Sequence, residues 1–288
     1  MTTLALGLVL TSAFLHASWN FLLKKSGGGA GLVTAASAAS LVVWLPVIVV
    51  VIAWQGYAFE PMHLVLMLGS GVIHMAYFLL LDRAYRKGGD LSIVYPLARA
   101  TGPLLAILVA VALLGERPGP TAIAGAILIV ASAIVLTGNP FTWHRGTSRH
   151  AVGFALLTGC TVATYTVWDK AAVSHWTISP ILYDYGCIAF RAAAMLPWTH
   201  AHAPGDIARA WRERRKTLIA IAVMSPLAYI LVLTAMVFTP VSLVAPAREV
   251  SILFAALMGA HLLREGGLAR RAIAAVGMAL GVAGLALG

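Results

Sequence analysis

Two stretches of this sequence place a proline and an arginine close together inside an apolar run. Pro96 precedes Arg99, and Pro246 precedes Arg248 and Glu249. Guanidinium is a planar donor that binds carboxylate or phosphate through paired hydrogen bonds, and a carboxylate held in an apolar run can take up and release a proton. These residue types predict that Arg99 and Arg248 bind an anionic group, and that Glu249 couples this binding to protons.

The two stretches are copies of one another, about 150 residues apart. Residues 91–99 read Leu-Ser-Ile-Val-Tyr-Pro-Leu-Ala-Arg, and residues 241–249 read Val-Ser-Leu-Val-Ala-Pro-Ala-Arg-Glu. Proline removes a backbone donor and loosens a helix, so we expect helix breaks at Pro96 and Pro246. A charged, broken helix in each of two repeats is typical of secondary transporters. The copies are not equivalent, because Tyr95 in the first is Ala245 in the second.

The charges also have a purely structural interpretation. An arginine near the middle of a bilayer costs roughly 2.5 to 3.5 kcal/mol, so Arg99 and Arg248 must face a partner or a watery cavity. Asp184 and Arg191 lie seven residues apart and share one helical face, which makes them a second coupling pair or a link to a neighbouring helix. The carboxylates that could neutralise the first two arginines are Glu249, Asp184 and Glu116. Both interpretations remain open from sequence.

Polar and aromatic side chains complete a candidate substrate path. The first apolar segment carries a stripe of polar side chains at steps of four residues, and the apolar segment that begins at residue 151 carries a matching polar face. Because polar groups are costly against lipid, both should point inward. Aromatic rings near these faces can stack on a ring or a cation, although Trp19 and Trp168 could instead form an interfacial belt or pack between helices. His74 and His261 are more typical of histidines that bond between helices. The stripe is Ser12, His16, Asn20 and Lys24, and the matching face is Thr161, Tyr165 and Asp169. The predicted substrate-binding residues are His16, Trp19, Asn20, Tyr77, Tyr95, Arg99, Tyr165, Trp168, Tyr229 and Arg248, with Glu249 and Asp184 as coupling groups.

The elements that position these residues must lie in a membrane. Of 288 residues, 60% are apolar and only 10% are charged, and the mean hydropathy is +0.90, which leaves too little polar surface for a soluble globule. The first apolar segment lacks the basic start and the cleavage site of a signal peptide. The template of about 20 apolar residues fits ten times and predicts an all-α integral membrane protein with no soluble domain. The expected spans are 4–23, 31–53, 63–81, 91–114, 121–136, 151–173, 178–197, 217–238, 241–263 and 271–287.

Charge and repeat together predict the topology. The net charge is +10, but most basic residues fall between spans, in the connections that follow odd-numbered spans, so they indicate orientation rather than a nucleic-acid partner. The positive-inside rule then places both termini outside the cytoplasm. Five spans per half is an odd number, which predicts two inverted repeats, 1–138 and 151–288, joined by a linker at 139–150. The basic connection 209–216 should touch anionic lipid headgroups.

Other chemistry is not indicated. Cys160 and Cys187 lie in apolar stretches, and no paired Cys or His spacing predicts a disulfide or a metal site. We find no catalytic triad and no phosphate-binding glycine loop, so we expect no enzyme activity and no cofactor. The glycines of the last span have the spacing of a packing face, which could form a homodimer or pack within one chain. They are Gly277, Gly281, Gly284 and Gly288.

The sequence resembles the drug/metabolite transporter superfamily, in its bacterial EamA-like branch, over essentially its whole length. The resemblance lies in the 5+5 repeat, the run His-Ala-Ser-Trp-Asn at 16–20 followed by Lys24, and the proline-containing spans that end in Gly-Glu-Arg at 115–117 and Arg-Glu at 264–265. It implies an inner-membrane carrier that works by alternating access and commonly exports amino acids or other small metabolites. It also implies a central cavity, lined mainly by the first, third, fourth, sixth, eighth and ninth spans.

The residues and the resemblance together predict a carrier that exports a small anionic or zwitterionic metabolite, such as an amino acid, driven by a proton or substrate gradient. Aromatic or cationic drugs and phosphorylated compounds are alternative substrates. A membrane channel or scaffold is the alternative of a different class, but a channel should show a continuous ring of polar residues rather than two related, proline-containing helices.

Overall fold

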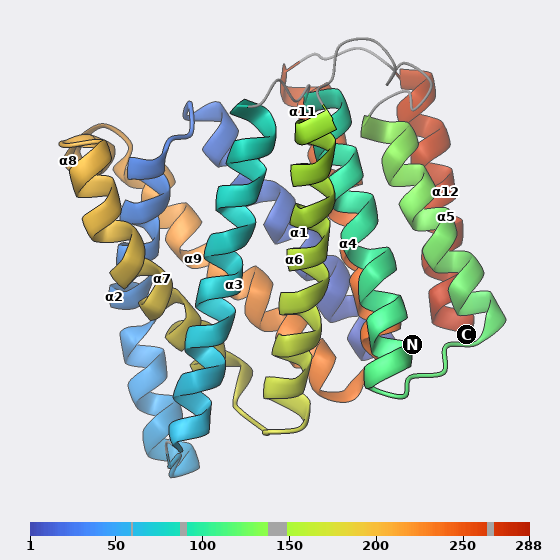
Figure 1. Cartoon of the computed structure of the whole chain (residues 1–288), viewed down its shortest axis with the longest axis horizontal. Coiled ribbons are helices and arrows are strands. Elements are labelled where there is room, and N and C mark those ends of the chain that lie inside the picture. The colour runs from blue at the N-terminus through green and yellow to red at the C-terminus, as the bar shows by residue number, and fades with distance from the viewer. Residues whose placement is uncertain (59, 87–90, 138–148, 264–267) are drawn as a thin grey trace.

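Helices account for all the regular structure in the part of the chain that the computed structural model describes, which is residues 1–58, 60–86, 91–137, 149–263 and 268–288. The long helices alternate in direction, so that the chain runs up and down across the molecule (Figure 1). The helices are α1 (Thr3–Lys25), α2 (Ala30–Gln55), α3 (Pro61–Arg86), α4 (Leu91–Leu113), α5 (Pro120–Thr137), α6 (Arg149–Ser174), α7 (Pro180–His202), α8 (Asp206–Glu213), α9 (Arg215–Phe238), α10 (Val241–Arg248), α11 (Val250–Leu263) and α12 (Leu268–Leu287).

Five helical segments of the described residues are long and apolar enough to cross a membrane. They are Thr3–Lys25, Ala30–Gln55, His150–Ser174, Arg215–Phe238 and Val241–Met258, and four shorter apolar helices accompany them: Pro61–Tyr77, Leu97–Leu113, Pro120–Leu136 and Arg271–Leu287. Helix α7, which carries Asp184 and Arg191, belongs to neither group. Large apolar side chains such as Val42, Leu108 and Val276 stay exposed on the outside of the bundle, where lipid would solvate them.

Helices that are distant in sequence pack in pairs. α1 packs against α9, and α6 packs against α3 and α4, while α2 contacts α7 and α5 contacts α12. Both termini lie at the same end of the bundle, at the lower right of Figure 1. There the Met1 ammonium donates to the carbonyls of Leu285, at 3.2 Å, and Ala286, at 3.3 Å. The N-terminus is therefore held against the last helix.

Glycines allow α5 and α12 to approach closely. A Cβ on Gly125 would lie 2.9 Å from the backbone nitrogen of Leu285 and 3.1 Å from the carbonyl carbon of Gly284, closer than ordinary van der Waals contact. Gly277 and Gly281 face Ser132 and Ile129 of α5 in the same way. The glycine face of α12 thus packs within the chain, and we call this contact the α5–α12 seam.

The two proline-containing copies have different backbones. In the second copy the helix is interrupted, since α10 ends at Arg248 and α11 begins at Val250, and the Glu249 amide bonds to the Pro246 carbonyl at 3.0 Å. In the first copy α4 runs without interruption from Leu91 through Pro96, so the break expected there is not present. One missing N–H does not by itself end a helix; the second copy differs in having a carboxylate at its turn.

Candidate functional site

A central cavity of about 350 Å³ lies among nine of the described helices, α1–α4, α6, α7 and α9–α11. The resemblance implies a cavity lined by the first, third, fourth, sixth, eighth and ninth spans, which correspond to α1, α3, α4, α6, α9 and α10–α11. All of these helices line the cavity, and so do α2 and α7. The cavity brings together most of the residues predicted from sequence. Those that line it are His16, Trp19, Asn20, Tyr77, Arg99, Tyr165, Tyr229 and Arg248, with Asp184 and Glu249.

Two of the predicted site residues whose side chains the structure describes, Trp168 and Pro246, are not part of the lining. Trp168 donates from its indole to the Leu66 carbonyl at 2.9 Å and packs on the core between α3 and α6, which is the packing alternative for this residue. Pro246 is buried in α10 beside the cavity rather than on its wall. The side chains of Tyr95 and Pro96 lie outside the described part of the structure, as does that of His261.

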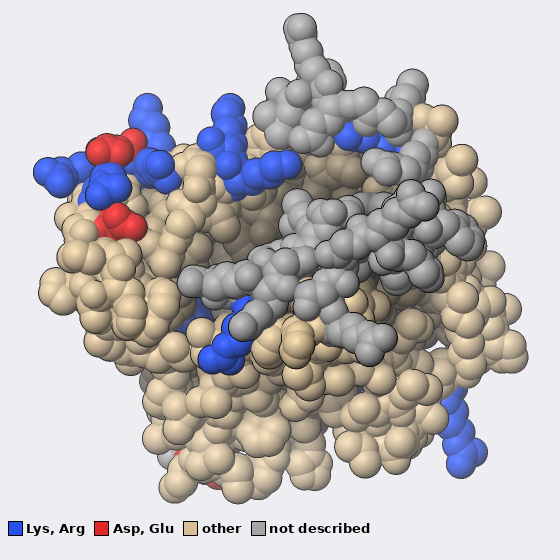
Figure 2. Space-filling model, turned by 45° about the horizontal axis from the view of Figure 1, so that its top comes forward, with Lys and Arg blue, Asp and Glu red and all other residues tan. Residues whose placement is uncertain are grey.

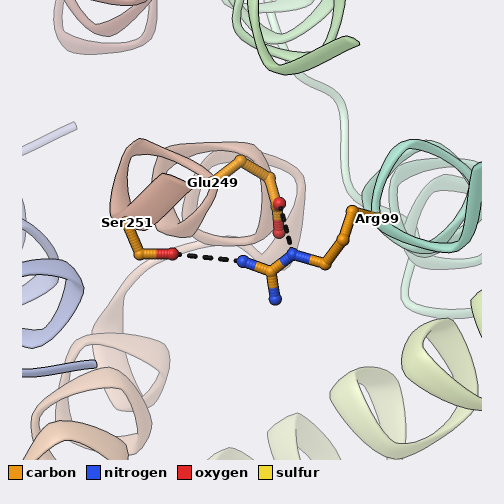
Figure 3. Close-up of polar contacts among 3 residues, drawn as sticks. All are labelled: Arg99, Glu249 and Ser251. Carbon is orange, nitrogen blue, oxygen red and sulfur yellow. Dashed lines mark hydrogen bonds and ion pairs between the residues drawn. The ribbon is translucent and has the colours of Figure 1, made fainter. Parts of the chain in front are cut away.

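An ion pair joins the two copies of the repeat inside the cavity (Figure 3). Arg99 Nε lies 3.1 Å from Glu249 Oε2, and Arg99 Nη2 donates to Ser251 Oγ at 3.1 Å. The Arg99 side chain is 20% exposed and that of Glu249 only 7%. Arg99 and Glu249 are the ninth residues of the two copies, so equivalent positions carry opposite charges and meet across the cavity.

Arg248 is held by an aromatic ring rather than by a carboxylate. Its guanidinium carbon lies 5.5 Å from the centre of the Tyr229 ring, within the range of a cation–π contact. Among the described residues, no carboxylate lies within ion-pair distance of Arg248. Its charge is thus directed at the cavity with a neutral partner behind it.

A fully buried carboxylate positions Tyr229. Asp169 accepts a hydrogen bond from the Tyr229 hydroxyl and another, at 2.6 Å, from the Tyr183 hydroxyl. Sequence reasoning placed Asp169 on the inner face of its span but did not assign it a partner. The chain Arg248, Tyr229, Asp169 therefore links the cavity wall to the core.

Removing the Tyr229 hydroxyl tests this link. We expect Tyr229→Phe to lower the free energy of unfolding by about 1 to 3 kcal/mol, because a buried carboxylate loses a donor. The measurement is the midpoint of thermal unfolding in detergent. Tyr185→Phe is the matched control, since the Tyr185 hydroxyl donates to the neutral Leu41 carbonyl at 3.1 Å. A loss at Tyr229 no larger than that at Tyr185 would show that Asp169 does not depend on this bond.

Two further charges face the cavity from α7. Asp184 and Arg191 both line it, and neither Asp184 Oδ2 nor Arg191 Nε, both buried, has a hydrogen-bond partner in the described part of the chain. The two side chains do not come within the 4.0 Å of an ion pair. Their spacing of seven residues predicted the common face, and the structure places that face on the cavity wall.

The rest of the wall is aromatic and weakly polar. His74 stacks on Tyr165 with ring centres 4.1 Å apart, and its Nδ1 bonds to the Ser70 carbonyl at 2.9 Å. His16 meets Trp19 edge to face at 5.2 Å, and the buried Trp19 Nε1 lacks a described partner. Sequence reasoning did not single out several small polar residues of the lining, because isolated serines and threonines carry no spacing signal. They are Ser37, Ser40, Thr166, Ser225 and Ser251.

Glu116, which the sequence offered as a partner for the arginines, has another role. Its two carboxylate oxygens accept from the backbone amides of Val241, at 2.7 Å, and Ser242, at 2.8 Å. A carboxylate at a helix N-terminus satisfies free amides and complements the helix dipole. Glu116 therefore anchors the start of α10, and its negative charge does not neutralise Arg248.

Comparison with known proteins agrees with this architecture. Residues 149–287 match the model of the family described as "EamA-like transporter family". No curated protein matches the chain. A solved structure described only as "Crystal structure of protein" covers 100% of this chain and 98% of its own, with a TM-score of 0.77 and 18% sequence identity, which supports the fold alone. The resemblance inferred from sequence is confirmed: the second half of the chain matches the EamA-like transporter family of the drug/metabolite transporter superfamily, and the long apolar helices support a multi-pass membrane protein.

Proposed function

We propose that this protein is a secondary carrier that exports a small anionic or zwitterionic metabolite, such as an amino acid, across the bacterial inner membrane. The observation that carries the proposal is the charge balance of the central cavity. Glu249 compensates Arg99 at 3.1 Å, whereas Arg248 and Arg191 have no described carboxylate partner. The export direction rests on the resemblance alone.

The unpaired charges match a zwitterion. A substrate carboxylate can bind to a guanidinium, which offers two parallel donors, and a substrate ammonium can bind to Asp184. Two cations against one anion leave a surplus of positive charge, so an anion is favoured over a cation. The tyrosines 165 and 229 supply apolar area for the rest of the molecule.

The helix packing supports ten spans arranged as two inverted five-helix repeats. We assign α1–α5 to the first repeat and α6, α7, α9, α10–α11 and α12 to the second. Exchanging the repeats turns the α1–α9 contact into the α6–α3 contact and maps α2–α7 and α5–α12 onto themselves. This is the contact pattern that a two-fold pseudo-axis requires, and such an axis lets a carrier open to either side of the membrane in turn.

We propose that the end carrying α8 faces the cytoplasm. In Figure 2 most of the Lys and Arg side chains lie toward this end, away from the termini, as the positive-inside rule requires. Reporter fusions at the N-terminus and at the C-terminus should therefore both give the periplasmic signal. A cytoplasmic signal from either fusion would contradict this orientation.

The Arg99–Glu249 pair is our candidate for proton coupling. It connects the two repeats, so a carrier that moves them apart must weaken it. Protonation of Glu249 removes one charge of the pair and lowers the cost of separating it. Substrate binding can then be linked to the movement of a proton through the same cavity.

A ligand screen tests the substrate class. Purified protein is heated with amino acids, organic acids, sugar phosphates or cationic drugs, and a bound compound raises the unfolding midpoint in proportion to RT ln(1 + [L]/Kd). We expect a carboxylate or phosphate compound to stabilise the protein. Stabilisation by cationic or neutral aromatic compounds only would favour the alternative substrate class, with the tyrosines and Trp19 as the site. A channel or scaffold should gain no stability from any of them.

A further inference from the structure

A second cavity, of about 790 Å³, lies outside the central site, between α2, the end of α7, α8 and the start of α9. We call it the α8 groove. The lining residues of α2 are Ala35, Ala38, Ala39, Val42 and Val43, and several of them recur at helical spacing on one face. Because alanine side chains end at Cβ, this face leaves a deep space. The opposite face of α2, with Val33, Ser37 and Ser40, lines the central cavity, so α2 separates the two.

The rim of the α8 groove is cationic. Trp211 and Arg212 of α8 and His200 of α7 line it, and all three side chains are exposed. Arg215 lies over the Trp211 ring, 5.3 Å from its centre. Residues 206–216 contain five basic and two acidic side chains, and the basic side chains of Figure 2 gather over this end of the molecule.

The basic side chains of this segment do not all have the same freedom. Arg209 pairs with Asp206 at 3.3 Å, and Arg214 donates to the Gly28 carbonyl at 3.3 Å. Arg212 has no described partner of either kind. It is therefore the guanidinium at the groove that remains available for a ligand.

We propose that the α8 groove binds one anionic phospholipid, with an acyl chain against the alanine face of α2 and the phosphate at Arg212. An apolar groove with a cationic rim matches the two parts of such a lipid. The groove lies beside the first half of α2, the end of α7 and the start of α9, and an exposed tryptophan such as Trp211 is typical of the membrane interface. Its volume falls within the range of small-molecule sites. This site is independent of the substrate and of transport.

Native mass spectrometry of the full chain in detergent tests the proposal, with phosphatidylglycerol and phosphatidylcholine of identical acyl chains as probes. We expect phosphatidylglycerol to bind more tightly. Arg212→Gln should weaken its binding about fivefold, the effect of one basic residue near an anionic lipid surface. Arg209→Gln is the matched control, since it removes the same charge from the same helix but outside the lining, and it should change binding less than twofold.

Ala38→Phe tests the groove itself. The added ring fills the space against α2, so binding of both lipids should fall while the unfolding midpoint without lipid stays near that of the wild type. Ala39→Leu is the second variant if Ala38→Phe does not fold. Equal affinity for the two lipids, or equal losses in Arg212→Gln and Arg209→Gln, would overturn the proposal. Unchanged lipid binding in the folded groove variants would also overturn it. The same holds if glycerol phosphate competes for the site as strongly as the intact lipid does.

Discussion

Arg248→Ala is expected to weaken the binding of a carboxylate substrate about 30-fold or more. Arg248 is the cavity guanidinium whose described partner is an aromatic ring, and truncating one partner of a buried charge pair costs about 2 kcal/mol or more. The measurement is isothermal titration calorimetry with the compound that gives the largest stabilisation in the ligand screen. Arg248→Lys keeps the charge but loses the two parallel donors, so its affinity should fall between those of the wild type and the alanine variant.

The control for Arg248 is a surface arginine. Arg209→Ala removes the same group from α8, where its guanidinium pairs with Asp206, and substrate affinity should not change. If Arg248→Ala binds like the wild type, the cation–π contact with Tyr229 is a helix-packing contact, and the positive surplus of the cavity must be assigned to Arg191.

Glu249→Gln is expected to reduce transport driven by a pH gradient to the level of protein-free vesicles. Glutamine keeps the size of the side chain and can still accept a hydrogen bond from Arg99, but it cannot carry a proton. Transport is measured in proteoliposomes, once with a pH gradient and once as exchange of labelled for unlabelled substrate without one. We expect exchange to persist in the variant, because exchange needs no net proton movement.

Ser251→Ala is the matched control for Glu249→Gln. It removes the other described contact of the Arg99 side chain, at 3.1 Å, without removing a titratable group, so the response to the pH gradient should survive. An unchanged response in Glu249→Gln would identify the Arg99–Glu249 pair as a static link between helices and would exclude Glu249 as the coupling group.

The position of the site could be predicted from the sequence because lipid penalises charge so strongly. A side chain such as Arg99, Arg248 or Asp184 within an apolar segment has to face inward, and helical spacing is then enough to assign it to a common wall. Eight of the ten predicted substrate-binding residues line one cavity for this reason. The helical class of the protein follows from composition in the same way.

The pairing of these side chains could not be predicted, because it depends on how helices far apart in sequence approach one another. Glu116 had the charge to neutralise an arginine, yet its position beside α10 directs it to backbone amides. Trp168 has the same amphipathic ring as Trp19, but the Leu66 carbonyl lies within reach of its indole. In the sequence Asp169 is one polar residue among several, and only the structure shows that hydroxyls of two tyrosines from other helices donate to its carboxylate.

The α5–α12 seam has a mechanical consequence. Where backbone packs on backbone at Gly125, Gly281 and Gly284, there are no side chains whose rotamers could change to let the helices slide or separate. No described side chain of either helix lines the central cavity, so each helix can stay fixed while the cavity walls rearrange. We therefore expect the seam to act as a pivot about which the remaining helices of each half rock, with the largest displacements at α2 and α7, which line the cavity but lie outside the seam.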